Sequence, residues 1–471
     1  MSLDPENWTP LRQLGHQMLD DMFDHLQGLA DNPLWRDPDE AKGRFISDTP
    51  LKPTQLSEVH AQFMRDVLPY NSGNKHSGFM GWVQGAGTPV GLLADMLTSG
   101  LNINAGGRNH MGMVVEQQIS TWMRDLFDYP NTSNGLFLTG TSQANFVAII
   151  AARTKALGQG VRKDGLEKGL VAYASAEVHG CVTHAMDIAG LGERSLRRIA
   201  INKDHQMDMA ALEAAIKADL AQGLKPFMLI GSAGTVNVGA IDDLKALADL
   251  AQIYGLHFHI DGAFGALGVM SKRLKPLLSG IERSDSIAFD FHKWAHVPYD
   301  AGFVLVRDEA LLKDSFASHA AYLTRAASGL AAGEWWACDY GPDLSRSLRA
   351  LKTWFTLKTY GIDALGAHME SNCDLARQLG ARIEAEPDLM LLAPIALNIV
   401  CFSYNHPLSD ALNAAIIEAL HEEGRVAPSL SVLKGKRIIR VSILNHRTEF
   451  ADIDRLISSV LRLGKSLSAS L

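Results

Sequence analysis

The stretch between Asp261 and Lys293 constrains this chain more than any other feature of its sequence. A run of apolar residues at 256–260 ends at the Asp, and a second run at 286–289 leads into the turn 290–293 that ends at the Lys. Both runs have the length and composition of buried β-strands. Because functional groups of an open α/β sheet gather at the carboxyl ends of its strands, the sequence predicts a carboxylate and an amine in one crevice.

This pair of groups has the chemistry that pyridoxal 5'-phosphate (PLP) requires. The amine of a Lys forms a Schiff base with the aldehyde of this cofactor. A carboxylate paired with the pyridine nitrogen keeps that nitrogen protonated, so that the ring accepts electrons from the substrate. Isolated Asp and Lys residues are usually solvated surface charges, and the PLP interpretation therefore needs support from elsewhere in the chain.

Support comes from a predicted turn between an apolar strand and a helix. Residues 136–138 are apolar, the small residues Gly140, Thr141 and Ser142 follow, and the next residues have helical spacing. The first N–H groups of a helix bind anions well. An ordinary helix cap would give the same pattern, but beside the Asp and Lys motifs the phosphate of PLP is the better interpretation.

Two runs resemble the signature of the group II PLP-dependent amino-acid decarboxylases, such as the aromatic-L-amino-acid, glutamate and diaminobutyrate decarboxylases. They are His259-Ile260-Asp261-Gly262-Ala263 and His292-Lys293-Trp294. The resemblance extends over nearly the whole chain. It implies the aspartate aminotransferase-like fold (fold type I of the PLP-dependent transferases) and a homodimer with active sites at its interface. It also implies decarboxylation of an L-amino acid to an amine and CO2, with PLP bound to Lys293.

The resemblance also assigns roles to individual residues. His179, which follows a predicted strand, would stack on the cofactor ring, while Thr141 and Ser142 would contact its phosphate. Tyr340, in a Gly- and Ala-rich segment at 323–345, is the nearest Tyr to the one that delivers a proton in the family. The implied catalytic residues are Lys293, Asp261, His179 and Tyr340, and the implied cofactor-binding residues are Thr141, Ser142, His179, Thr235, Asp261, Ala263, His292 and Lys293.

Two positions depart from the family pattern. Val236 stands where relatives have a Thr that approaches the cofactor, which leaves Thr235 or Ser232 as substitutes. Asp290 stands where some members have an Asn near the phosphate. Since a carboxylate would repel a phosphate, we expect the Asp290 side chain to turn elsewhere.

The rest of the chain fits an α/β fold in three parts. Seven apolar strand candidates lie between residues 136 and 306 with helices between most of them, which favours a mainly parallel sheet covered on both faces. Residues 1–90 are predicted to form N-terminal helices that clasp the partner subunit, residues 91–361 the large PLP-binding domain and residues 362–471 a small α+β domain. The first helix is expected to have Thr9 as its N-cap.

Composition excludes several classes of protein. The 471 residues include 44 basic and 52 acidic ones, and the net charge of −8 gives no reason to bind nucleic acid or an anionic membrane. No apolar run reaches the ~18 residues of a transmembrane helix. The 4 cysteines form no Cys-x-x-Cys pair, and the acidic N-terminus has no signal-peptide core. We therefore expect a cytoplasmic enzyme that acts on a small-molecule amino acid.

Two alternatives remain open. The same Asp and Lys serve other PLP reactions, namely aldehyde synthesis, C–C bond cleavage and transamination. A protein of a different class, a metal-binding protein, is suggested by His257, His259 and Asp261, which alternate on one predicted strand and so share a face.

Aromatic residues give a weak indication of the substrate. Phe79, Trp82 and the pair Trp335-Trp336 lie in segments that flank the pocket in the family. They favour an aromatic or bulky apolar side chain. No basic pair stands out in these segments to receive a second carboxylate, which counts against Glu as the substrate.

Overall fold

The computed structural model describes residues 2–166, 169–318 and 324–469, and the chain divides into two compact units. The larger unit contains Val83–Ala381 and Leu391–Cys401, and the smaller unit contains Met1–Trp82, Arg382–Met390 and Phe402–Leu471. The N-terminal and C-terminal segments, predicted as separate domains, thus fall in one unit. The reason lies in a strand pairing, since β1 (Phe79–Met80) runs parallel to β11 (Ala427–Leu433).

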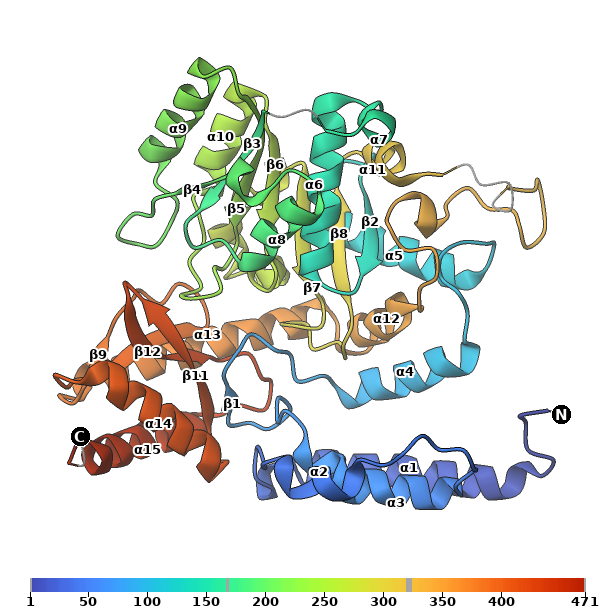
Figure 1. Ribbon diagram of the computed structural model, residues 1–471, viewed down its shortest axis with the longest axis vertical. Coiled ribbons are helices and arrows are strands. Elements are labelled where there is room, and N and C mark those ends of the chain that lie inside the picture. Colours follow the sequence, from blue (N-terminus) through green and yellow to red (C-terminus); the bar gives the residue numbers. More distant parts are fainter. Residues whose placement is uncertain (1, 167–168, 319–323, 470–471) are drawn as a thin grey trace. The chain divides into compact units, whose positions relative to one another are not determined.

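The larger unit is built on a seven-stranded sheet with the order β2-β8-β7-β6-β5-β3-β4 (Figure 1). Strands β3 to β7 run parallel, and β8 is antiparallel to both of its neighbours. The predicted mainly parallel α/β sheet is therefore confirmed. The strands are β2 (Asn134–Leu138), β3 (Leu170–Ser175), β4 (Leu196–Ile199), β5 (Lys225–Ser232), β6 (His257–Asp261), β7 (Ser286–Asp290) and β8 (Gly302–Val306).

The reversed direction of β8 creates the loop that carries Lys293. Residues 291–301 connect the carboxyl end of β7 to the start of β8, and so short a connection joins neighbouring strands only when they are antiparallel. Every residue of β7 and β8 is buried. The sheet therefore anchors the loop at both of its ends.

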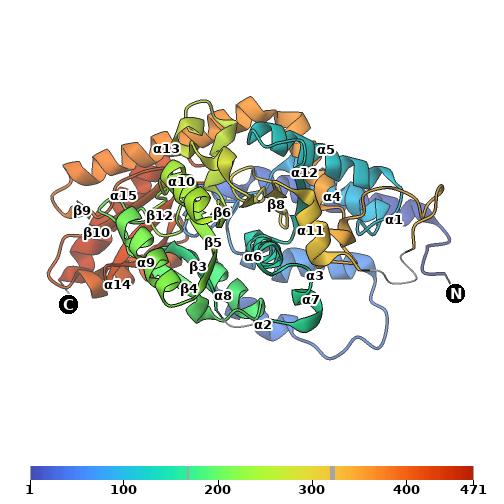
Figure 2. The same cartoon turned by 90° about the horizontal axis from the view of Figure 1, so that it is seen from above.

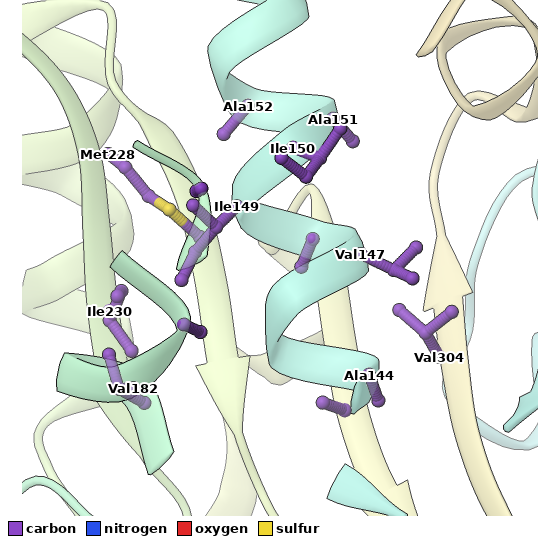
Figure 3. Packing of buried hydrophobic residues seen from close by; sticks show 14 of the residues in the cluster. Ala144, Val147, Ile149, Ile150, Ala151, Ala152, Val182, Met228, Ile230 and Val304 are labelled. Atoms are coloured by element: carbon purple, nitrogen blue, oxygen red, sulfur yellow. The ribbon is translucent and has the colours of Figure 1, made fainter. Parts of the chain in front are cut away.

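Helix α6 (Thr141–Leu157) packs against this sheet and is buried along most of its length. Figure 3 shows Val147 directed toward Val304 of β8, and Ile149 lying beside Met228 of β5. The helix begins directly after the carboxyl end of β2. Burial of its apolar side chains, at about 25 cal/mol per Å² of apolar surface, thus fixes where the N-terminus of α6 lies relative to the strands.

Other helices complete the larger unit, and Figure 2 shows α6 nearly end-on, with α5 and α12 beyond β8. Among the described residues, no helix combines the length and the apolar character that crossing a bilayer requires. The remaining helices are α4 (Pro89–Leu101), α5 (Met111–Leu126), α7 (Val161–Asp164), α8 (Gly180–Ile188), α9 (Met209–Ala221), α10 (Leu244–Tyr254), α11 (Glu309–Phe316), α12 (Arg349–Tyr360) and α13 (Ile362–Ala385), of which the part up to Ala381 belongs to this unit.

The smaller unit contains the N-terminal helices α1 (Trp8–Gln27), α2 (Asp39–Phe45) and α3 (Leu56–Asp66) and the C-terminal helices α14 (Ser409–Glu423) and α15 (Phe450–Ser468). A second sheet has the order β1-β11-β12-β10-β9. Its remaining strands are β9 (Leu389–Leu391), β10 (Ile399–Tyr404) and β12 (Lys436–Ser442). Strands β1 and β11 are absent from the sequence prediction. Strand β1 is only 2 residues long and shows no period.

The start of α1 corrects one detail of the sequence prediction. The N-cap is Asn7, whose side-chain oxygen accepts a hydrogen bond from the N–H of Thr9 at 3.0 Å. The predicted cap at Thr9 is therefore wrong. Asn caps a helix at least as well as Thr does.

Candidate active site

Four of the predicted site residues lie near carboxyl ends of strands in the larger unit. Asp261 is the last residue of β6 and pairs with Ala288 of β7. Lys293 follows β7, Thr141 opens α6 after β2, and His179 precedes α8 after β3. Because β2 and β7 are both antiparallel to β8, they run in the same direction, and these strand ends share one edge of the sheet.

The amine of Lys293 is paired with Asp290. Its Nζ lies 3.1 Å from Oδ2 of Asp290, while Oδ1 of the same carboxylate accepts a hydrogen bond from the N–H of Thr141 at 2.7 Å. The expectation that Asp290 turns away from the predicted phosphate turn is therefore wrong. The first N–H groups of a helix lack intrahelical partners and carry positive partial charge, so they stabilise a carboxylate as readily as a phosphate.

His292 fixes the conformation of the loop around Lys293. Its Nδ1 accepts a hydrogen bond from the N–H of Ala301 at 3.0 Å, which closes the loop 291–301. Its ring lies against Tyr299, with 4.3 Å between the ring centroids. Burial lowers the pKa of His292, although the nearby Asp290 opposes that shift. A neutral His292 with an acceptor at Nδ1 carries its proton at Nε2.

Asp261 is a buried carboxylate with two hydrogen-bond donors. Its Oδ2 accepts from the side-chain amide of Asn145 at 3.2 Å, and its Oδ1 accepts from the N–H of Ala263 at 3.3 Å. Burial raises the pKa of Asp261, and the charges of His179 and Lys293 oppose that shift. The predicted contact of Ala263 thus holds the carboxylate through the backbone.

His179 follows β3, as predicted, and is the N-cap of α8. Its Nδ1 accepts a hydrogen bond from the N–H of Cys181 at 3.2 Å, and the residue is exposed. The thiol of Cys181 is hydrogen-bonded to the side chains of Ser142 and Asn145, and burial raises its pKa to about 12. The first turns of α6 and α8 therefore meet at an un-ionised thiol.

Glycine is required where α6 begins. A Cβ added at Gly302, the first residue of β8, would lie 2.3 Å from the Cα of Gly140, the N-cap of α6. No side chain tolerates so close a contact with backbone. The close approach of these two glycines brings the first turn of α6 beside the loop of Lys293.

Thr235 forms hydrogen bonds within the turn that follows β5. Its N–H donates to the carbonyl of Ala240 at 2.8 Å, and its Oγ1 accepts from the N–H of Ala240 at 3.1 Å. Ser232, the other predicted substitute, lies on β5 in register with Asp261. A contact of Thr235 with PLP stays a prediction, since the observed bonds of this side chain close the turn that follows β5.

Tyr340 is not brought together with the other predicted residues. It is buried in the hydrophobic cluster that includes the apolar residues of α6, and its ring is stacked on Trp335 with 5.5 Å between centroids. Of the Gly- and Ala-rich segment 323–345, residue 323 lies outside the described residues. The described part near Tyr340 contributes a core aromatic pair.

The alternative of a metal site is not supported. His257 and His259 both hydrogen-bond to Oγ of Ser286, at 2.9 and 2.8 Å, and Asp261 is held by Asn145. Within the described ranges, no group of three or more His, Cys, Asp or Glu side chains is arranged to hold a metal ion. The shared strand face was predicted correctly, but its side chains bond to protein groups.

The residues present fit PLP. The Lys293 side chain is 21% exposed, so that an aldehyde can reach its amine, and Asp261 supplies the buried carboxylate that a pyridine nitrogen needs. The hydroxyl of Thr141 is buried without a hydrogen-bond partner among the residues that the structure describes. Together with the exposed Ser142 it offers a phosphate donors at the N-terminus of α6.

Sequence reasoning missed Asn145, Ser286 and Tyr299. A signal existed for Asn145, because it follows Thr141 by one helical turn and therefore lies on the same face of α6. Ser286 gave no signal, since a small residue in a buried strand is ordinary. Tyr299 lies beside His292 only because the loop 291–301 folds back on itself.

Comparisons with known proteins agree with this geometry. A family model described as the pyridoxal-dependent decarboxylase conserved domain matches residues 38–405. An aromatic-L-amino-acid decarboxylase of Bacillus atrophaeus is 30% identical over 98% of this chain and 96% of its own length. A phenylacetaldehyde synthase of Arabidopsis thaliana is 26% identical over 94% of this chain and 93% of its own length.

A solved structure agrees over the whole chain. Oryza sativa TDC, crystallised with PLP and tryptamine, superposes with a TM-score of 0.91 at 22% identity, covering 99% of this chain and 100% of that one. This likeness confirms the predicted fold type I. Since the family match also spans most of the sequence, the chain belongs to the pyridoxal-dependent decarboxylase family, whose cofactor is PLP.

Proposed function

We propose that this enzyme removes the α-carboxyl group of an aromatic L-amino acid as CO2, with PLP held by Lys293. One observation carries the proposal, namely a lysine amine and a buried carboxylate, Asp261, at the carboxyl ends of two adjacent parallel strands. The substrate class is supported by relatives named as aromatic-L-amino-acid and tryptophan decarboxylases.

When bound, PLP supplies a protonated ring that accepts the electron pair of the broken bond between Cα and the carboxylate. Lys293 provides the amine that holds the cofactor aldehyde until the substrate amine takes its place. Asp290, 3.1 Å from that amine, keeps it close to the first turn of α6. Asp261 holds the proton at the pyridine nitrogen, which it does only while its own carboxylate is ionised.

The anchoring groups are assigned to the two helix starts. Thr141 and Ser142, at the N-terminus of α6, would hold the phosphate, with the buried unpartnered hydroxyl of Thr141 as one donor. His179, exposed at the start of α8, would cover the ring and orient the substrate carboxylate. Both assignments use side chains at the sheet edge where Asp261 and Lys293 lie.

The proton that replaces the carboxylate at Cα needs a donor. Tyr340 is the sequence-based prediction, but burial raises its pKa to about 12 and its ring is packed in the core. Such a phenol is a poor acid near neutral pH. We therefore assign this proton to His179, whose charge already influences the buried Asp261.

A homodimer is part of the proposal. Helix α1 is 20 residues long and has no buried residue, and it exposes Trp8 and Leu11. An apolar stripe of this kind favours a partner subunit. Sedimentation of wild type at twice the mass of the Leu11→Asp variant would support this, and a monomeric wild type would contradict it. The cytoplasmic location predicted from the sequence belongs to the same proposal.

A second candidate function is oxidative conversion of the amino acid to an aldehyde. It is favoured by the relatives named as phenylacetaldehyde synthases, which are 25% and 26% identical over nearly the whole chain. Both functions use the same Lys293 and Asp261. The two differ in their products, because aldehyde formation consumes O2 and water as co-substrates and releases ammonia and hydrogen peroxide beside CO2.

A substrate panel tests both candidates. The PLP-loaded enzyme is incubated with tryptophan, tyrosine, phenylalanine, dihydroxyphenylalanine, diaminobutyrate and phenylserine, and CO2, amine, aldehyde and ammonia are quantified together. We expect amine and CO2 in equal amounts from an aromatic substrate. Aldehyde with ammonia would establish the second candidate, and a keto acid without CO2 would overturn both.

A further inference from the structure

A row of buried polar side chains leads from His257, the first residue of β6, to Asp261, the last residue of that strand. We call its members, His257, Ser286, His259 and Asn145, the histidine chain. The links are His257 Nε2 to Ser286 Oγ at 2.9 Å, Ser286 Oγ to His259 Nδ1 at 2.8 Å, His259 Nε2 to Asn145 Oδ1 at 2.8 Å and Asn145 Nδ2 to Asp261 Oδ2 at 3.2 Å. Each of the four is at most 1% exposed.

The direction of the last two links, from His259 to Asn145 and from Asn145 to Asp261, follows from what each atom can donate. Asn145 turns its amide NH2 toward Asp261 and also toward the sulfur of Cys181, at 3.4 Å, so its carbonyl oxygen faces His259. A carbonyl oxygen only accepts. His259 must therefore carry a proton at Nε2.

The remaining links then have one possible direction. Burial lowers the pKa of His259 to about 3, so the ring is neutral and its Nδ1 accepts the proton of the Ser286 hydroxyl. A hydroxyl has a single proton, and Ser286 must therefore accept from Nε2 of His257. Burial lowers the pKa of His257 to about 4, which leaves its Nδ1 without a proton.

The reverse direction is disfavoured at the outer end of the chain. It would need a proton at Nδ1 of His257, a nitrogen that has no hydrogen-bond partner among the described residues. The nearest carboxylate, that of Asp285, has an oxygen 4.0 Å away. Both oxygens of this carboxylate already accept hydrogen bonds, one from Lys155 and one from the N–H of Phe258. A reversed chain would also turn the carbonyl of Asn145 toward Asp261.

We propose that the histidine chain acts as a directional set of donors that keeps the carboxylate of Asp261 ionised for the pyridine nitrogen of PLP. The proposal rests on the PLP-dependent function of the preceding section. Each donor points toward Asp261, and successive hydrogen bonds polarise one another in a low-dielectric interior. The members of the chain are positioning residues, since only Asn145 touches Asp261.

Other groups also face Asp261 and act in the same sense. The charges of Lys293 and His179 and the N–H of Ala263 favour its ionised form. Burial opposes them. The chain is distinguished from these groups by Ser286, a residue that is not hydrogen-bonded to Asp261 and whose hydroxyl nevertheless supports the Nε2 tautomer of His259 by donating to its Nδ1.

Removal of one hydroxyl tests this relation. Ser286→Ala deletes the link between the two histidines, and Ser284→Ala is the matched control. Ser284 is equally buried and lies just before β7, but its hydroxyl bonds to Tyr129 and Ile281, outside the chain. Ser286→Thr restores a hydroxyl at the same position.

The first readout is the protonation state of the cofactor. Enzyme loaded with PLP that carries 15N at its pyridine nitrogen is titrated by NMR. We expect the proton affinity of the pyridine nitrogen, read from the midpoint of its titration, to be roughly tenfold lower in Ser286→Ala than in wild type. The reason is that one hydrogen bond to a charged network is lost. Ser284→Ala should match wild type, and Ser286→Thr should return toward it. An unchanged midpoint in a folded Ser286→Ala overturns the proposal.

A second readout needs no variant at position 286. The 15N spectrum of histidine-labelled, PLP-loaded wild type reports which ring nitrogen carries the proton, with His257→Gln and His259→Gln used for assignment. Both rings should be neutral and protonated at Nε2. A proton at Nδ1 of either ring overturns the inferred direction.

The two readouts also separate this proposal from the proposed function. Failure of the function would appear as a protein that does not bind PLP or releases no CO2, and it would leave the histidine tautomers as derived. Failure of the chain would leave PLP binding and decarboxylation intact, with a pyridine nitrogen that does not respond to Ser286.

Discussion

The carboxylate of Asp290 accepts a hydrogen bond from the N–H of Thr141 at 2.7 Å, at the first turn of the helix expected to hold the cofactor phosphate. The other carboxylate oxygen lies 3.1 Å from the amine of Lys293. One negative charge thus bridges the two groups that PLP must engage through its phosphate and its aldehyde. Cofactor loading has to compete with these contacts.

Asp290→Asn should therefore tighten PLP binding. An Asn of the same shape lacks the charge that repels a phosphate, and one unit charge at 4 Å is worth ~1 kcal/mol even in bulk water, so affinity should rise at least about fivefold. Titration of apo enzyme with PLP, followed by absorbance, measures the change. Asp300→Asn is the control. It removes another carboxylate of the loop 291–301, one that is paired with Arg349 of α12. Equal or weaker binding in Asp290→Asn would contradict the competition.

Lys293→Ala should reduce decarboxylation to background. The change removes the amine that holds the cofactor aldehyde, while the donors at α6 remain. Borohydride reduction followed by peptide mass spectrometry should find the cofactor on Lys293 in wild type and on no peptide in the variant. Lys313→Ala, at an exposed position of α11, should behave as wild type. Cofactor attached to another lysine in wild type would refute the assignment.

Gly302→Ala should destabilise the enzyme and disturb the phosphate turn. Its Cβ would lie 2.3 Å from the Cα of Gly140, and overpacking of this kind costs about 1–3 kcal/mol. Thermal unfolding and PLP titration measure the two effects. Gly180→Ala is the control, because a Cβ there meets nothing within 4 Å. A Gly302→Ala variant as stable as wild type would show that the two segments can separate freely.

The buried pair of Arg346 and Glu116 should contribute strongly to stability. Their closest atoms are 2.8 Å apart, each side chain is 1% exposed, and Arg346 also donates to the carbonyls of Ala105 and Phe137. Arg346→Ala leaves a buried carboxylate without its partner and should cost about 3–5 kcal/mol.

Denaturant unfolding with a surface comparison checks this value. Arg462→Ala breaks an exposed pair with Glu423, and such pairs contribute about 0–1 kcal/mol. Similar losses in Arg346→Ala and Arg462→Ala would mean that the buried pair adds little beyond packing.

The two buried histidines should make the enzyme sensitive to acid. Burial lowers the pKa of His257 to about 4 and of His259 to about 3, from 6.5 in the unfolded chain. Between these values the unfolded state binds more protons, so stability is lost as pH falls below 6.5, by about 1.4 kcal/mol per pH unit for each residue.

Apparent melting temperatures between pH ~6.5 and pH ~4.5 measure the effect. His257→Gln should show a shallower loss than wild type, and the exposed His184→Gln should show the same loss as wild type. If His257→Gln did not change how steeply the melting temperature falls with pH, this ring would not be buried in its neutral form.

Local sequence information was sufficient for the elements and for part of the site. Alternation and apolar runs predicted the seven strands of the larger unit, and the residues at their ends, Asp261, Lys293 and Thr141, were found because a strand end is visible in the sequence. The strand β1 escaped, since a 2-residue pairing carries no period. Tyr340 was predicted only from its position in the sequence, and in the structure its ring is buried in the hydrophobic core.

The sequence by itself determined the fold class, the family and the chemistry-bearing Asp and Lys, because these depend on short motifs and on the periods of single elements. Only the tertiary structure decided the partners of those groups. His259 meets Asn145 across 114 positions of sequence, and Asp290 meets Thr141 across 149. Such contacts arise from how α6 packs on the sheet, and this packing is set by many side chains together. A local sequence pattern therefore does not predict which polar atoms come within hydrogen-bond distance.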